Sequence, residues 1–144
     1  MEKWLIWFCR AAAMGVGWGA AWVPIFGSAG PLIEPLIGLT DEPWLIASVL
    51  AGFPCGAVFA TLAGTARERL PLDQLPVGRA AATGAVGGLL VGLLWLAVVW
   101  LSESANWLFV GGVVGFLTLL SALSGIGTTL LARMGKDNSR AGVA

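Results

Sequence analysis

The chain has 144 residues, enough for one domain. Hydrophobic residues make up 58% of the sequence and charged residues 11%, and eight basic residues balance eight acidic ones. Soluble domains contain about 25% charged residues, so the composition excludes an ordinary water-soluble fold, and we expect no nucleic-acid partner. The sequence has no histidine, which removes the commonest metal ligand and the usual proton shuttle.

Four uncharged, apolar runs follow one another along the chain. Each is long enough to cross a bilayer core of roughly 30 Å, which takes about 20 residues. The first run lies between Arg10 and Glu34, and the third lies between Arg79 and Glu103. The runs are continuous and do not alternate, which predicts helices and not the strands of an outer-membrane barrel. The predicted helices cover residues 11–31, 44–64, 80–101 and 107–132, after an interfacial lead-in at 2–8.

The sequence therefore predicts an all-α membrane protein, a bundle of four transmembrane helices. Residues 1–132 form its single domain in this interpretation. Residues 133–144, which follow the last apolar run, are predicted to be a flexible cytoplasmic tail.

The charges lie asymmetrically around the predicted spans. The connections 32–43 and 102–106 contain no basic residue and hold Glu34, Asp41, Glu42 and Glu103. Because basic segments stay in the cytoplasm, we expect a multi-pass protein of the inner (cytoplasmic) membrane with both termini in the cytoplasm. All the basic residues fall on that one side: Lys3, Arg10, Arg67, Arg69, Arg79, Arg133, Lys136 and Arg140.

Parts of the sequence repeat. Residues 10–15 and 79–84 open the first and third helices with similar strings, and a Trp-Leu start leads to Gly52-Phe53 in the second helix and to Gly115-Phe116 in the fourth. A duplication would give two helical hairpins related as parallel repeats about an axis along the membrane normal. Alternatively, helices rich in alanine and glycine resemble each other by composition alone.

Glycines spaced by four mark every predicted helix. In lipid, helices associate through close backbone approach and dispersion, which small residues on one face permit. These faces are predicted to pack either within the chain or against a partner subunit or another copy. The packing glycines are Gly15, Gly19, Gly52, Gly56, Gly84, Gly88, Gly92, Gly111 and Gly115.

Trp18 and Trp22 lie on one face of the first helix, about 10–16 Å into the bilayer by the helical rise. Their rings could stack on a flat apolar ligand such as a quinone, carotenoid or tetrapyrrole. The alternative is that the two rings fill grooves left by glycines on neighbouring helices.

The sequence offers no catalytic or metal-binding motif. Nothing matches a nucleophile with its base, a phosphate-binding loop or a metal cluster, so we expect no enzyme activity, catalytic residue, metal or cofactor. Glu34, Asp41 and Glu42 could gather a cation, but a solvated acidic loop explains them more simply.

Several strings together resemble a loose group of uncharacterised bacterial four-helix integral membrane proteins, over about residues 10–133. No activity or functional residue follows from this resemblance. The strings lie at 18–24, 41–44, 52–59, 72–75, 88–92 and 120–124.

The leading hypothesis is a non-enzymatic protein that works by helix–helix association, with membrane lipid and other transmembrane helices as its partners. It would be an accessory or scaffold subunit of a complex, or a homo-oligomer. One rival is the apolar-ligand binder described above. The other is a small transporter or channel of oligomerised hairpins, with a water-filled path lined by Ser48, Thr61, Thr83, Thr118, Ser121, Ser124 and Thr128.

Overall fold

The computed structural model describes residues 2–37, 44–65, 72–100 and 107–141. Within these ranges the backbone forms four α-helices and a short 3-10 helix, and no strand, which confirms the predicted all-α class. In chain order the elements are α1 (Glu2–Ile37), α2 (Trp44–Thr65), η1 (Leu72–Gln74), α3 (Val77–Trp100) and α4 (Trp107–Ala141).

Two of the helices are much longer than a bilayer crossing requires. α1 has 36 residues and α4 has 35, whereas α2 has 22 and α3 has 24. At a rise of 1.5 Å per residue, α1 and α4 extend about 50 Å, well beyond a hydrocarbon core of roughly 30 Å. The predicted lead-in at 2–8 is the first part of α1.

Residues 133–141, which the sequence analysis assigned to a flexible tail, continue α4 as a helix. The physical reason is a set of contacts with the segment that joins α2 to α3. Arg133 Nε donates to the carbonyl of Asp73 at 3.1 Å, and Arg133 Nη2 donates to the carbonyl of Leu75 at 2.9 Å. Lys136 forms a salt bridge with the carboxylate of Asp73. Residues 142–144 lie outside the described residues.

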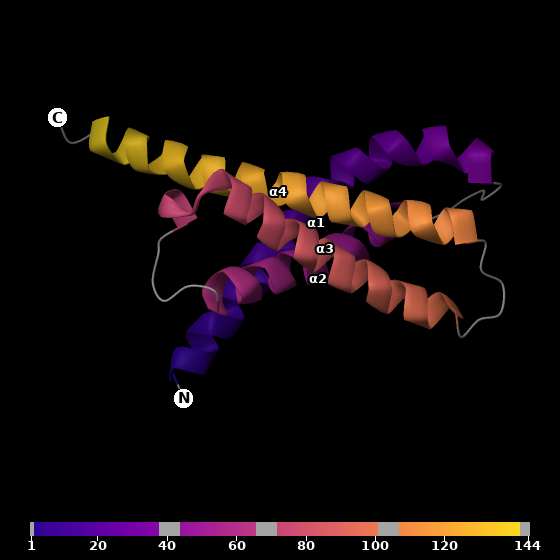
Figure 1. Ribbon diagram of the computed structural model, residues 1–144. Coiled ribbons are helices and arrows are strands. Elements are labelled where there is room, and N and C mark those ends of the chain that lie inside the picture. The colour runs from indigo at the N-terminus through magenta and orange to yellow at the C-terminus, as the bar shows by residue number, and fades with distance from the viewer. Residues whose placement is uncertain (1, 38–43, 66–71, 101–106, 142–144) are drawn as a thin grey trace.

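Prolines interrupt the backbone hydrogen bonding of α1 and α2. Pro24 lies inside α1 and Pro54 inside α2, and each removes one helical N–H donor. Figure 1 shows α1 changing direction near its middle, as an internal proline favours. The hydroxyl of Ser28 donates to the carbonyl of Pro24 at 2.7 Å.

The helices pack as two antiparallel hairpins, α1 with α2 and α3 with α4. Figure 1 shows the α3–α4 hairpin lying across the α1–α2 hairpin. The two hairpins meet mainly through α2 and α3, with fewer contacts than either hairpin has internally, and η1 packs on α4. The core is one cluster at this crossing: Trp18, Trp22, Cys55, Phe59, Ala63, Leu117 and Leu120.

Two described segments are long and apolar enough to cross a membrane, Val77–Ala97 in α3 and Gly111–Lys136 in α4. α2 contributes a shorter apolar segment, Ser48–Gly64. By length and hydropathy alone, these segments of α3 and α4 could each cross a membrane.

Candidate functional site

Trp18 and Trp22 lie at the centre of the molecule. Their spacing of four places both indoles on one face of α1, with ring centroids 6.3 Å apart and planes at 30°. Trp18 is 4% exposed and Trp22 is fully buried. Pro24 follows them by two residues on the same helix.

Both indole N–H groups donate to hydroxyls of α4. Trp18 Nε1 donates to Thr128 Oγ1 at 3.1 Å, and Trp22 Nε1 donates to Ser124 Oγ at 2.9 Å. The hydroxyl of Thr128 in turn donates to the carbonyl of Ser124 at 2.8 Å. These bonds join the first hairpin to the second, and they satisfy two donors that would be costly to bury unpaired.

Phenylalanines continue the ring stack on both sides of the tryptophans. Trp18 lies 5.0 Å from Phe59 of α2, and Trp22 stacks on Phe26 at 6.1 Å with planes at 14°, both measured between ring centroids. Phe26 meets Phe116 of α4 edge to face at 5.6 Å. We call these five rings the aromatic cluster. Its rings pack against one another within the same chain, an arrangement that favours packing over the stacking of a flat ligand.

The sequence did not single out the three phenylalanines of the aromatic cluster. Phe59 follows Pro54 and Cys55, and Phe116 follows the glycine that was matched to Gly52. Either could have been found by its helical spacing from a packing glycine, but the direction in which each ring points depends on how the hairpins cross. That crossing leaves no signal in the sequence.

A buried serine and cysteine lie beside the aromatic cluster. Ser121 of α4 and Cys55 of α2 are both fully buried and face each other. Within the described residues, Ser121 Oγ makes no hydrogen bond of standard geometry, and the thiol of Cys55 lies within weak hydrogen-bonding reach of it. Its hydroxyl does not back-bond to its own helix in the way that Thr118 and Thr129 do.

Glycines set the distance between α1 and α2. A Cβ placed on Gly52 would lie 2.8 Å from Gly19 Cα, and one placed on Gly56 would lie 2.7 Å from the carbonyl of Met14. A Cβ on Gly15 would lie 2.8 Å from the carbonyl of Phe53. Such distances to backbone atoms leave no room for a side chain, so the two helices touch backbone to backbone along this face.

α3 approaches α4 in the same way. A Cβ on Gly88 would lie 2.5 Å from the carbonyl of Leu117, one on Gly84 would overlap the carbonyl of Ser121, and one on Gly92 would lie 3.2 Å from Val114 Cγ1. In this hairpin the glycines of α3 face residues of α4 that carry side chains, whereas in the first hairpin Gly19 faces Gly52.

Gly111 and Gly115, the packing glycines predicted on α4, have no such neighbour. A Cβ at either position would meet no heavy atom within 4 Å among the described residues. The glycine of α4 that packs inside the hairpin is Gly125, whose Cβ would lie 2.5 Å from the carbonyl of Ala80. Within the described residues, Gly111 and Gly115 therefore make no packing contact inside the chain.

The packing contacts pair the residues of the first hairpin with those of the second differently from the sequence repeat. Gly88 meets Ser121 on α4 as Gly19 meets Gly52 on α2. Packing therefore matches Gly52 with Ser121, whereas the sequence repeat matched Gly52 with Gly115. The matching of the helix starts at Trp44 and Trp107 does not carry over to the packed faces.

Three of the seven hydroxyls proposed to line a transport path are bound to their own helices. Thr61, Thr118 and Thr128 donate to carbonyls four residues earlier, at 2.7 to 2.8 Å. Ser124 accepts the indole bond from Trp22. These bonds remove polar groups that a hydrated path would need, so the geometry favours a packed interior.

In the described part of the chain, no group of three histidine, cysteine or acidic residues could hold a metal ion. The acidic connection with Asp41 and Glu42 lies outside the described residues, as does the side chain of Glu34. Comparison of the chain with protein-family models, with curated proteins and with solved structures finds no match.

Proposed function

We propose that the chain is an integral membrane protein whose four helices cross the inner membrane, and that it acts through helix–helix association without catalysing a reaction. It would serve as an accessory or scaffold subunit of a membrane complex, or as a homo-oligomer. The partners in this proposal are membrane lipid and the transmembrane helices of other subunits.

The exposure of the apolar segments supports membrane insertion. Only 28% of Val77–Ala97 and 28% of Gly111–Lys136 is buried, whereas the core helix of a soluble protein would be mostly covered. In water such a surface would far exceed the few hundred Å² of contiguous apolar area that soluble monomers show. Large exposed apolar side chains of α3 include Val86, Leu89, Leu90, Leu93, Leu94 and Trp95.

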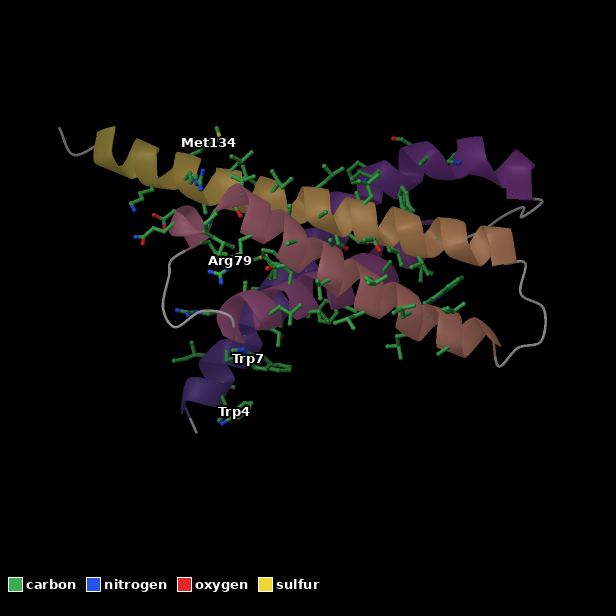
Figure 2. The ribbon with its side chains drawn as sticks, in the orientation of Figure 1. Trp4, Trp7, Arg79 and Met134 are labelled. Atoms are coloured by element: carbon green, nitrogen blue, oxygen red, sulfur yellow. The ribbon has the colours of Figure 1, made fainter. Side chains whose placement is uncertain are left out.

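The placement of charged and aromatic residues supports the proposed orientation. Figure 2 shows Trp4 and Trp7 of α1, Arg79 of α3 and Met134 of α4 on the same side of the molecule. Tryptophan and basic residues together are typical of the cytoplasmic membrane interface. Trp4 and Trp7 meet edge to face at 6.0 Å between ring centroids, and Trp4 is 75% exposed.

The open glycine face of α4 carries the proposal of association. Gly111, Gly112 and Gly115 are exposed with no heavy atom close to a Cβ position, although glycines elsewhere in the chain bring helices into backbone contact. A glycine face without an internal partner can accept a second helix at the same close distance. We therefore place the association surface at the start of α4.

The test is native mass measurement of the protein extracted in a mild detergent. We expect the unmodified chain to appear as a homo-oligomer or with a bound membrane protein, and Gly115→Leu to release it as a monomer. Gly17→Leu is the matched control, because Gly17 is also exposed and open but lies on α1. A monomer without a partner in the unmodified sample would contradict the proposal.

A further inference from the structure

The end of α4 holds the segment between α2 and α3 in place. Residues 72–76 form a closed turn, with the N–H of Leu75 donating to the carbonyl of Leu72 at 3.2 Å. The carbonyl of Pro76 then accepts from the N–H groups of Arg79 and Ala80, at 2.9 and 3.0 Å. This segment is thus built onto the first turn of α3. Within the described residues, Arg133 and Lys136 of α4 make charged contacts with this segment.

The same segment covers one end of the buried core. Leu75 is 6% exposed, and Leu72 packs against the core cluster that includes Phe59 and Ala63. On α4, the fully buried Thr129 lies one helical turn before Arg133. Figure 1 shows η1 lying alongside the C-terminal part of α4, at the end where α3 begins.

The links to α4 differ in strength and in access to solvent. Arg133 makes two charge-assisted bonds to backbone carbonyls, which are stronger than neutral hydrogen bonds. The pair of Lys136 and Asp73 is partly exposed, with 40% and 14% of the side chains accessible, so salt screens it. Apolar burial holds this segment in place on one side. On the other side it is held by electrostatic contacts, with which dissolved ions can compete.

We propose that residues 72–76 form a lid over this end of the core, held closed by Arg133 and Lys136 and released when competing ions draw these two side chains away. An open lid uncovers the junction of the two hairpins at the end where α3 begins. This inference concerns a conformational switch within the chain and goes beyond the proposed function, on which it does not depend.

Two single-cysteine proteins report on the lid. In the first, Cys9→Ser, Cys55→Ala and Thr129→Cys leave one thiol near the lid. In the second, Cys9→Ser alone leaves the native Cys55, which is buried between α2 and α4. The measurement is the rate of reaction with a maleimide for the purified full-length protein in detergent.

We expect Asp73→Asn and Arg133→Gln each to raise the rate at position 129 and to leave the rate at Cys55 unchanged. Loss of the two carbonyl bonds of Arg133 corresponds to about tenfold faster labelling. Raising sodium chloride from low concentration to molar concentration should accelerate position 129 about two- to fivefold, the effect of losing one partly exposed pair. The control is Arg79→Gln, which removes an exposed positive charge at the same end and should change neither rate.

The exchanged pair Asp73→Lys with Lys136→Asp should bring the rate at position 129 back toward that of the parent. The proposal is overturned if neither Asp73→Asn nor Arg133→Gln accelerates position 129. It is equally overturned if both thiols accelerate together, because the contacts then support general stability and not a lid.

Discussion

At the scale of single residues, the joint between the two hairpins depends on two indole N–H bonds. Trp18 and Trp22 present their nitrogens to Thr128 and Ser124 across the bundle. In a membrane interior, side-chain hydrogen bonds between helices contribute about 0.6 kcal/mol on average and up to about 1.7 kcal/mol. The bonds are modest in free energy, but they fix the rotation of α1 against α4.

The change Trp22→Phe tests this joint, because it keeps an aromatic ring and removes the donor. We expect the free energy of unfolding in detergent to fall by about 1 to 2 kcal/mol, from the lost bond and the smaller ring. Combining it with Ser124→Ala in a double-mutant cycle isolates the hydrogen bond. The control Trp95→Phe, at a 41% exposed position, should change little. Full additivity in the cycle would show that the bond contributes nothing.

At the scale of helices, stability depends on how closely the backbones approach. Gly84 and Gly88 allow the carbonyls of Leu117 and Ser121 to lie where side chains would otherwise stand. Dispersion attraction grows steeply as surfaces approach each other. The missing Cβ atoms therefore stabilise each hairpin by letting the two backbones come close, a role that large apolar side chains have in soluble proteins.

The substitution Gly84→Ala should therefore destabilise the fold, although alanine is the better helix former. Its methyl group would overlap the backbone carbonyl of Ser121, which cannot move without moving α4. We expect a loss of about 2 kcal/mol, typical of overpacking, in detergent-denaturation measurements. Gly17→Ala, with open space around it, should be neutral or stabilising by about 0.5 kcal/mol. A stable Gly84→Ala protein would show that α3 and α4 are not held this tightly.

The sequence was sufficient to predict the helical class and the approximate positions of the helices. Uncharged runs are bounded by charges such as Arg79, and Trp44 and Trp107 mark helix starts in the structure as predicted. The sequence did not predict the ends of α1 and α4. A helix can continue past its apolar run where tertiary contacts stabilise it, as those of Arg133 do near the end of α4. The packed face of α4 was also missed, since Ser121 is less conspicuous than Gly115 in a search for glycine pairs.

At the scale of the whole molecule, the two hairpins cross with a small shared core and a large apolar exterior. The buried cluster lies at the crossing, while leucines of α3 and α4 cover much of the outside. An apolar exterior of this extent is favoured where the surroundings are themselves apolar. The proposed membrane location thus accounts for the shape as well as for the composition.

The proposed orientation is tested by labelling intact cells with a membrane-impermeant maleimide. The native Cys9 is exposed on α1 and is expected on the cytoplasmic side, so it should react only after the cells are permeabilised. In a Cys9→Ser background, Ser104→Cys in the opposite connection should react without permeabilisation. Labelling of Cys9 from outside would invert the proposed topology.

The backbone contacts between helices also limit how this sequence can change over time. Every missense mutation of a glycine codon introduces at least a methyl group, so positions such as Gly56, Gly84 and Gly125 have no conservative neighbour in the genetic code. Exposed leucines can be exchanged for other apolar residues at little cost. Drift should therefore accumulate on the exterior, whereas a new residue at a contact glycine would have to displace the facing helix, because the nearest atoms belong to that helix's backbone.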